Sequence, residues 1–369
     1  MRLMFVCRQF GDMAGGVEWT ATNLMNELDR RGHAVSLFTW DPQGARTFFP
    51  LNESITWYRL NMGDPVQKAG FPLRVRRVRR FRGFVRGQKP EAVIGFQHGA
   101  FLFAAASLPG RRVPVVLAER NAPDRMDHIS EGRFRHAVFQ SMRLAAAITV
   151  QLESYVERYP AYLRPRIVAI PNPVYAPDGF ASPGTEKSVY TLLSVGRLSY
   201  QKNYDSLIRA FAAVAGEFPR WKLRIVGEGE RRRELESLVS RSGLGPRIEM
   251  GGATKDVSAE YRSADLFCLS SLWEGFPNTL AEAMAHGLPC VAYRGCAGAN
   301  ELIRDGDNGV LASGNGDVGT LSSQLRRLMN DGEKRVALGE RAKTIARDYE
   351  PGGIYDRWEE LFRKVATGR

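Results

Sequence analysis

The chain of 369 residues is poor in cysteine and has no long apolar run. Its four cysteines, Cys7, Cys268, Cys290 and Cys296, lie far apart without a CxxC pair or histidine-rich neighbours. This spacing supports neither a disulfide framework nor a zinc site. A membrane-spanning helix needs about 18 to 20 apolar residues, and the run from Met1 to Cys7 is also too short for a signal peptide. We therefore expect a cytosolic protein that does not cross a membrane.

The composition also excludes a disordered chain. Hydrophobic residues make up 44% of the sequence and charged residues 25%, which is typical of a folded soluble protein. The length suits two domains better than one core. The net charge of +12 is one-sided, because residues 1–172 hold 25 basic and 14 acidic residues while residues 173–369 hold 27 and 26. The first half is therefore expected to meet an anionic surface or ligand.

The first half has the pattern of a doubly wound α/β domain. An apolar strand from Leu3 to Cys7 is followed by glycines 11, 15 and 16, a helical pattern and a second strand from Ala34 to Trp40. A strand, glycine-rich turn, helix and strand form a βαβ unit, which favours a parallel sheet. Further buried strands are expected at residues 92–96, 113–118 and 146–150.

The best linker candidate is the segment Ile-Pro-Asn-Pro-Val, residues 170–174, with the polar stretch after it. We place the domain boundary after Asn172. Strands recur beyond it at residues 190–195, 223–226, 248–250, 265–270 and 289–292, with helical patterns between them. The second half is thus also α/β. The last helix, near residues 354–365, carries Trp358 and Phe362 on one face.

A basic segment stands out in the first half. No acidic residue occurs between Pro65 and Pro90, and eight positive charges lie within residues 74–89. These charges are Arg74, Arg76, Arg77, Arg79, Arg80, Arg82, Arg86 and Lys89. An apolar helical stripe runs among them, formed by Phe71, Val75, Val78, Phe81 and Val85.

Two interpretations of this helix stay open. The stripe alone predicts a surface helix packed on the domain core. The arginines also suit contact with anionic phospholipid or a pyrophosphate-linked lipid acceptor. Nucleic acid is not expected as a partner, because no tyrosine or tryptophan is interleaved for base stacking.

The most specific segment is EGFPNTLAE, residues 274–282, which places Glu274 and Glu282 eight positions apart around a strand-to-helix turn. Asn278 or Thr279 is expected to cap the helix, and Gly287 is expected to end it. Glu274 then follows the carboxyl end of a strand, where open α/β sheets bind ligands. Free backbone N–H groups at the start of the helix can receive a phosphate.

Two glutamates at this spacing are often only solvated charges at a helix end, and context favours a site here. Arg197 and Lys202 follow the strand at residues 190–195, and both can neutralise a diphosphate leaving group. A carboxylate accepts hydrogen bonds from vicinal hydroxyls, so Glu282 suits a ribose and Glu274 suits a sugar beyond the diphosphate.

At this point the chain resembles a family-4 retaining glycosyltransferase of the GT-B fold. Besides the Glu-x7-Glu block, the resemblance rests on GRLSYQKN at 196–203, RIVGEGERRRELE at 224–236, AHGLPCVA at 285–292, the glycine-rich loop at 14–17 and the linker at 171–173. It covers essentially the whole chain and is strongest from residue 189 to 313.

The resemblance implies an α/β fold of two Rossmann-like, doubly wound domains that face each other across a deep cleft. Residues 1–172 would bind the acceptor and residues 173–350 the nucleotide sugar. Residues 351–369 would form a helix that crosses back to the first domain.

The resemblance also implies roles for matching residues. Arg197 and Lys202 would bind the donor diphosphate, and Glu282 and Glu274 the ribose and donor sugar. Backbone amides after the turn would bind the distal phosphate, in the segment Phe276, Pro277, Asn278 and Thr279. The remaining donor residues would be Gly15 and Gly16, which let the first domain approach the phosphates, and Gly227 and Val257, which stand where the base is held.

Family members often carry a histidine or aspartate after the strand that matches residues 113–118. This chain has Glu119-Arg120-Asn121 there, so Glu119 is the nearest match and the usual histidine is missing. The same run resembles members that act on N-acetylhexosamines, which favours a UDP-linked donor. His98, after the strand at 92–96, is a second candidate for the acceptor site, although a lone loop histidine is often structural.

The sequence provides no good metal site. Asp305-Gly306-Asp307 has the spelling of the metal-binding DxD motif of other transferases, but the Asn-Gly that follows indicates a turn. We expect no metal and no cofactor, with Arg197, Lys202 and a helix terminus replacing the charge of a cation. The glycines at 11, 15 and 16 do not spell GxGxxG, which disfavours a dinucleotide oxidoreductase.

The predicted reaction transfers a hexose or N-acetylhexosamine, with retention, from a nucleoside-diphosphate sugar to a hydroxyl of a lipid-linked saccharide. Its expected place is bacterial surface-glycan synthesis, on the inner face of the cytoplasmic membrane. A GDP-mannose donor, a small soluble acceptor, a phosphorylase and a binding module that has lost catalysis remain alternatives.

Overall fold

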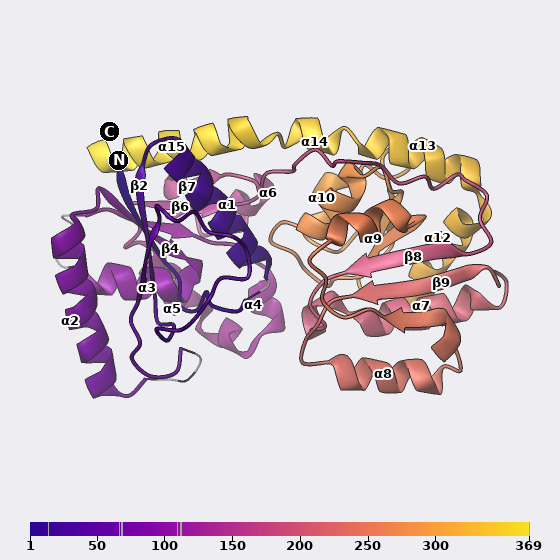
Figure 1. The fold of residues 1–369 in the computed structure, drawn as a ribbon, viewed down its shortest axis with the longest axis horizontal. Coiled ribbons are helices and arrows are strands. Elements are labelled where there is room, and N and C mark those ends of the chain that lie inside the picture. Colours follow the sequence, from indigo (N-terminus) through magenta and orange to yellow (C-terminus); the bar gives the residue numbers. More distant parts are fainter. Residues whose placement is uncertain (14, 66, 68, 109, 111–112, 369) are drawn as a thin grey trace. The chain divides into compact units, whose positions relative to one another are not determined.

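The computed structural model describes residues 1–369 except residues 14, 66, 68, 109, 111, 112 and 369. The chain divides into two compact units (Figure 1). The first unit contains residues 1–172 and 352–369, and the second contains residues 173–351.

The first unit is built on a seven-stranded sheet in the order β3-β2-β1-β4-β5-β6-β7. Every neighbouring pair in it is parallel. Its strands are β1 (Arg2–Val6), β2 (Ala34–Thr39), β3 (Thr56–Arg59), β4 (Ala92–Phe96), β5 (Val115–Ala118), β6 (Ala147–Val150) and β7 (Ile167–Ala169). The strand order reverses between β1 and β4, and open α/β sheets bind ligands beyond the carboxyl ends of strands at such a reversal.

Helices join these strands as right-handed α/β units require. They are α1 (Gly16–Arg30), α2 (Phe71–Gln88), α3 (Gln97–Ser107), α4 (Arg125–His128), α5 (Arg135–Met142) and α6 (Ser154–Glu157), with 3-10 turns η2 (Ser130–Phe134) and η3 (Arg164–Arg166). Phe81 of α2 packs edge-on against Phe38 of β2, with ring centroids 5.0 Å apart, and contacts Phe103 of α3 at 5.2 Å. This aromatic cluster fixes α2 to the sheet.

The last helix, α15 (Pro351–Thr367), belongs with the first unit for nearly its whole length. The ring of Phe362 meets Phe5 of β1 edge-on at 6.4 Å, and Trp358 is buried beside it. Arg31, after α1, donates to Asp356 and Glu359 at 2.6 and 3.1 Å. The predicted return of the C-terminal helix to the first domain is therefore confirmed.

The second unit is built on a six-stranded parallel sheet in the order β10-β9-β8-β11-β12-β13. Its strands are β8 (Tyr190–Val195), β9 (Trp221–Val226), β10 (Ile248–Met250), β11 (Leu266–Leu269), β12 (Cys290–Tyr293) and β13 (Val310–Ala312). This order repeats that of the first six strands of the chain, so both units are Rossmann-like and the predicted fold class is confirmed.

Helices cover both faces of this sheet, with α7 and α8 on one side and α9 and α10 on the other (Figure 1). They are α7 (Tyr204–Ala215), α8 (Arg232–Arg241), α9 (Val257–Ser263), α10 (Asn278–Ala285), α11 (Ala299–Leu302), α12 (Val318–Asn330), α13 (Gly332–Ala342) and α14 (Ile345–Asp348), with 3-10 turns η4 (Tyr200–Lys202) and η5 (Gly245–Arg247).

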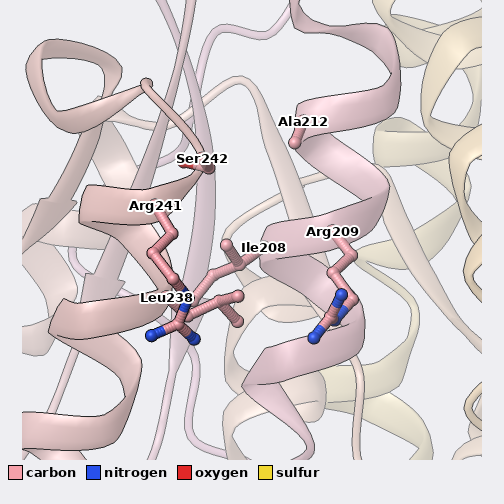
Figure 2. A pocket seen from close by; sticks show the side chains of 6 residues that line it. All are labelled: Ile208, Arg209, Ala212, Leu238, Arg241 and Ser242. Carbon is pink, nitrogen blue, oxygen red and sulfur yellow. The ribbon is translucent and has the colours of Figure 1, made fainter.

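A hollow of about 310 Å³ lies between α7 and α8 (Figure 2). Ile208, Ala212 and Leu238 give it an apolar floor, and the guanidinium groups of Arg209 and Arg241 stand on either side of it. None of the residues predicted to bind the donor lines this hollow.

Candidate functional site

The turn after β8 carries two cations. Arg197 is exposed, and within the described part of the chain its guanidinium makes no hydrogen bond or ion pair. Lys202, at the end of η4, is instead paired, with Nζ 2.6 Å from Oε1 of Glu274. Lys202 is therefore held at the carboxyl edge of the sheet while Arg197 is open to a ligand.

Glu274 lies in a polar cage and is only 6% exposed. The Ser271 hydroxyl donates to the same Oε1 at 2.6 Å, and the Gln201 amide lies 3.4 Å from Oε2. The backbone N–H of Glu274 donates to the Ala297 carbonyl. A buried carboxylate needs partners of this kind, and the cage fixes its position after β11.

Glu282 is one turn into α10 and half-buried. The Tyr261 hydroxyl of α9 donates to its Oε2 at 2.9 Å. Burial raises the pKa of Glu282 to about 7, while the Tyr261 hydroxyl and the charge of Lys202 act in the opposite direction. Lys202 is thus paired with Glu274, and its charge also acts on Glu282.

The start of α10 differs from the prediction. Asn278 is the first helical residue and Pro277 occupies the N-cap position, with no side-chain cap. The prediction that Asn278 or Thr279 caps this helix is therefore wrong, because the turn closes one residue earlier than expected. The Thr279 hydroxyl is buried and has no hydrogen-bond partner among the described residues. The ring of Phe276 is buried against Tyr349. At the start of α10 the N–H groups of Asn278 and Leu280 donate to the Phe276 and Pro277 carbonyls at 2.9 and 3.0 Å, and the Thr279 N–H makes no hydrogen bond with the described residues.

Gly227 and Val257 lie at the carboxyl ends of the neighbouring strands. A Cβ on Gly227 would lie 2.0 Å from the Gly196 carbonyl oxygen, so only glycine permits the two turns to approach this closely. Gly227 also has a φ of +147°. Val257 begins α9, which is capped by Asp256 through the Ala259 N–H at 2.9 Å.

In the first unit, Gly15 is the N-cap of α1 and Gly16 its first residue, again with no side-chain cap. The preceding loop is anchored by buried Asp41, whose Oδ2 accepts from the N–H groups of Phe10 and Gly11 at 2.9 and 3.2 Å. Residue 14 of the predicted glycine-rich loop lies outside the described residues. The amides of the α1 terminus therefore remain the candidates for a phosphate in this unit.

The Glu119 carboxylate accepts hydrogen bonds from the turn that follows it. Its Oε1 accepts from the backbone N–H groups of Arg120 and Asn121 and from the Asn121 amide, at 3.0 to 3.1 Å. The Arg120 guanidinium beside it is buried and donates to Thr149 Oγ1 at 2.7 Å. Burial lowers the pKa of Arg120 to about 10, against the opposing charge of Glu119. This arrangement gives Glu119 a structural task that the sequence did not reveal.

His98 has a defined tautomer. Its Nε2 lies 2.7 Å from the Ser141 hydroxyl, and that hydroxyl gives its own proton to the Val138 carbonyl at 2.7 Å. Nε2 must therefore be the donor, and Nδ1 carries the lone pair. Burial lowers the pKa of His98, against the charge of Glu119, so the ring is neutral near pH 7. The preceding residue, Gln97, has a φ of +65°.

The basic helix α2 needs two corrections. Arg77 does not face a membrane: it is only 7% exposed, and its guanidinium donates to the Met62 carbonyl at 2.6 and 3.1 Å. The predicted apolar stripe is also incomplete, because Phe71 is 79% exposed and only Phe81 and Val85 of the stripe are buried.

Two other arginines of α2 also donate hydrogen bonds to backbone carbonyls. Arg74 and Arg82 donate to the carbonyls of Ala69 and Ser107, and Arg82 is half-buried, while Arg74, Arg76, Arg79 and Arg80 are exposed. The exposed charge of α2 thus comes from fewer arginines than the sequence suggested. Among the described residues, no helix is both long and apolar enough to cross a bilayer.

The Asp-Gly-Asp segment is neutralised by arginines. Asp305 pairs with Arg294 and accepts from the Leu311 N–H, and Asp307 pairs with Arg304 and Arg341. No group of three or more potential metal ligands occurs in the described part of the chain. These pairings leave the two carboxylates to stabilise the turn.

Sequence reasoning missed three residues that organise the cluster, namely Gln201, Ser271 and Tyr261. Gln201 lies within the GRLSYQKN motif and Ser271 lies in the turn shortly before Glu274, so hydrogen bonding to Glu274 was a foreseeable role for them. Tyr261 is far from Glu282 in the sequence, and no local sequence pattern predicts that its hydroxyl donates to the Glu282 carboxylate.

Comparisons with known proteins identify the family. The family model described as glycosyl transferases group 1 matches residues 178–345, and the one described as a glycosyl transferase 4-like domain matches residues 15–173. The chain is 24% identical over 373 residues to the GalNAc-alpha-(1->4)-GalNAc-alpha-(1->3)-diNAcBac-PP-undecaprenol alpha-1,4-N-acetyl-D-galactosaminyltransferase of Campylobacter jejuni, with 99% of each chain covered.

Two solved structures match over essentially their full length. One is the sucrose-phosphate synthase of Thermosynechococcus elongatus, with a TM-score of 0.86, 17% identity and all of both chains covered. The other is HepE of Anabaena in complex with UDP and glucose, with a TM-score of 0.74, 20% identity and 99% and 100% of the two chains covered. Because the two family models together span nearly the whole chain, the protein belongs to the family-4 glycosyltransferases, and it has their GT-B fold.

Proposed function

We propose that this glycosyltransferase moves a hexose or N-acetylhexosamine from a UDP-linked donor to a hydroxyl of a lipid-linked saccharide in bacterial surface-glycan synthesis. One observation carries the proposal. Lys202 is paired with Glu274 and acts on Glu282, and the turns that carry Arg197 and the start of α10 follow the neighbouring parallel strands β8 and β11 at the carboxyl edge of the second sheet. A nucleotide sugar needs both charges at such a place: cations for its diphosphate and carboxylates for its sugar hydroxyls.

The diphosphate is assigned to Arg197, Lys202 and the first turn of α10. Arg197 supplies a guanidinium that makes no hydrogen bond or ion pair with the described residues. In the first turn of α10 the N–H groups of Asn278 and Leu280 already donate to backbone carbonyls, so the helix contributes the Thr279 N–H and a favourable dipole. The unpartnered hydroxyl of Thr279 in that turn is a further donor for a phosphate oxygen. These fixed donors would stabilise the negative charge that grows on the departing diphosphate, and we propose that no metal is required.

The sugars are assigned to the two glutamates. Glu282 would accept hydrogen bonds from the ribose hydroxyls and Glu274 from those of the transferred sugar. The cage around Glu274 holds that carboxylate ready before the donor arrives, which lowers the cost of ordering it. Transfer with retention would follow from holding the acceptor hydroxyl on the face from which the diphosphate leaves.

The similar proteins favour a uracil base in the donor. HepE is seen with UDP and glucose, and the Campylobacter jejuni relative is named for the transfer of N-acetyl-D-galactosamine. The Glu119-Arg120-Asn121 run points the same way. A GDP-mannose donor remains the second candidate for the base and the sugar.

The acceptor is assigned to the first unit. His98 presents a neutral ring whose Nδ1 makes no hydrogen bond with the described residues, which suits a hydrogen bond from an acceptor hydroxyl. Glu119 is retained as the residue that supports this turn, since its Oε1 is already occupied by three donors. A lipid-linked saccharide is preferred to a soluble one because of the exposed arginines on α2.

Membrane association is proposed through α2, on the inner face of the cytoplasmic membrane. Arg76, Arg79, Arg80 and the exposed ring of Phe71 form a basic surface with one aromatic group. Such a surface is attracted to anionic lipid, by roughly 1 kcal/mol for each basic residue at low ionic strength.

A panel of nucleotide sugars, scored by release of nucleoside diphosphate, tests the proposed chemistry. Release of UDP from a UDP-hexose or UDP-N-acetylhexosamine is expected, at the same rate in the presence of EDTA. Release of sugar phosphate would indicate a phosphorylase. Release of GDP alone would show that the donor is a GDP-linked sugar and not a UDP-linked one.

Sedimentation with vesicles tests the acceptor side. Binding to phosphatidylglycerol vesicles at low salt is expected, with little binding to phosphatidylcholine. The triple change of Arg76, Arg79 and Arg80 to glutamine should abolish it. Equal recovery of both proteins in the pellet would remove α2 from the proposal and favour a soluble acceptor.

A further inference from the structure

Tyr261 touches the proposed ribose-binding carboxylate without belonging to any motif that led to the site. It lies on α9, is 1% exposed, and its hydroxyl donates to Glu282 Oε2 at 2.9 Å. Its ring packs edge-on against Phe267 at 6.0 Å and beside the His286 ring at 4.9 Å. The ring is therefore locked by packing, and the hydroxyl is aimed at one carboxylate oxygen.

The consequence for Glu282 is that its two oxygens differ. Oε2 is taken by Tyr261, while Oε1 has no hydrogen bond within the described residues. A carboxylate held at one oxygen has a fixed plane, and it presents the other oxygen in a defined direction. Vicinal ribose hydroxyls need such a direction for both of their hydrogen bonds to form.

A second chain of contacts ties α9 to α10. His286 Nδ1 lies 2.7 Å from the Glu282 carbonyl oxygen, which can only accept, so the proton is on Nδ1. Nε2 then accepts from the Ser258 hydroxyl at 2.8 Å, and Arg262 donates to Ser258 Oγ at 2.6 Å. The helix that follows the proposed base-binding loop is thus fixed to the residue that binds the ribose, through both its side chain and its backbone.

We infer that Tyr261 is a positioning residue for the donor, which orients Glu282 so that its open oxygen selects a ribose over a 2′-deoxyribose. The inference rests on the proposed function, because it takes Glu282 as the ribose ligand. Tyr261 itself would not touch the donor, since its hydroxyl is already used and its ring is buried.

The ionisation of Glu282 gives a second readout. Lys202 from the turn after β8 and Tyr261 from α9 face the carboxylate, and both lower its pKa against the larger effect of burial. His286 hydrogen-bonds to the backbone carbonyl of Glu282, and Tyr204 and Cys290 act electrostatically on Tyr261. Removing the Tyr261 hydroxyl therefore raises the pKa of Glu282, so the pH at which the carboxylate ionises must also rise.

The test compares UDP with 2′-deoxy-UDP on the full chain. We expect wild type to prefer UDP, and Tyr261→Phe to weaken UDP binding about tenfold while 2′-deoxy-UDP changes much less, because a hydrogen bond to a charged group contributes about that much. The pH midpoint for UDP binding should move upward in the same variant. Turnover at saturating donor should stay close to that of wild type.

Two controls separate orientation from general damage. Tyr293→Phe removes another buried tyrosine hydroxyl, one that donates to the Asp317 carbonyl at 3.0 Å, and should leave both ligands unaffected. 3-Fluorotyrosine at position 261 keeps the hydroxyl and makes it a stronger donor, so it should shift the pH midpoint downward. The 3-fluorotyrosine variant tests the role of the Tyr261 hydroxyl even if Tyr261→Phe is poorly folded.

The variant Glu282→Gln distinguishes a failure of the role inferred for Tyr261 from a failure of the proposed function. If Glu282→Gln loses the preference for UDP and Tyr261→Phe keeps it with an unchanged pH midpoint, the role of Tyr261 is overturned while the proposed site stands. If Glu282→Gln keeps the preference, or wild type binds neither nucleotide, the proposed function itself is overturned.

Discussion

The ion pair between Lys202 and Glu274 makes the site and the stability of the second unit depend on each other. Nζ and Oε1 are 2.6 Å apart, and the two side chains are 15% and 8% exposed. Removing one partner from a buried pair costs about 3 to 5 kcal/mol, because the other charge is left without compensation. Lys202→Met should therefore destabilise the fold as well as remove the proposed contact with the diphosphate.

The hydrogen bonds that remain to the other partner determine how much stability each variant loses. Glu274 keeps the Ser271 hydroxyl and the Gln201 amide, so Lys202→Met is expected at about 3 kcal/mol, the lower end for a buried pair. Glu274→Gln leaves an ammonium on a flexible stem that can reach water, and about 1 to 2 kcal/mol is expected. The double variant removes both charges, and its loss should fall short of the sum by at least about 1 kcal/mol.

Differential scanning calorimetry measures the three variants against wild type, with the transition of the first unit as an internal reference. Turnover should fall at least about a hundredfold in every variant, including the double variant that regains stability. Additive losses in stability would mean that the pair is not formed. Wild-type turnover in Lys202→Met or Glu274→Gln would refute the assignment of the site.

Other consequences of the structure can be measured directly. Arg335 is buried and donates to three carbonyl groups, so Arg335→Met should cost about 2 to 4 kcal/mol in thermal unfolding and leave the donor KM unchanged. Because Glu282 has a pKa of about 7 and ionises above it, UDP affinity measured by calorimetry should rise from pH 6 to pH 8, and Glu282→Gln should remove this dependence. Gly227→Ala places a Cβ 2.0 Å from the Gly196 oxygen and should abolish UDP binding or folding of the second unit, whereas Gly216→Ala, where a Cβ meets nothing, should retain both.

The sequence predicted most of the central strands because each is a short, continuous apolar run. It missed β3, β7 and β13, which are all edge strands. An edge strand is half-covered and short, so its apolar signal is weak: every residue of β3 is exposed or half-buried, and β7 and β13 have three residues each.

The motif residues of the proposed donor site were visible in the sequence because they follow strands at fixed positions. Their partners were not, since the cage around Glu274 and the contact of Tyr261 with Glu282 depend on how elements pack. The burial of Arg77 is of the same kind. An arginine on the inner side of a helix appears in the sequence as one more surface charge until the Met62 carbonyl that accepts from it is known.

Arg197 gives the most direct test of the central claim, because its side chain is exposed and makes no hydrogen bond or ion pair with the described residues. Calorimetric titration should show that Arg197→Ala unfolds like wild type, binds UDP at least about tenfold more weakly, and binds uridine with unchanged affinity. Arg209→Ala, on the exposed side of α7, should match wild type in all three. Equal UDP affinity in Arg197→Ala and wild type would contradict the placement of the diphosphate, and with it the proposed donor site.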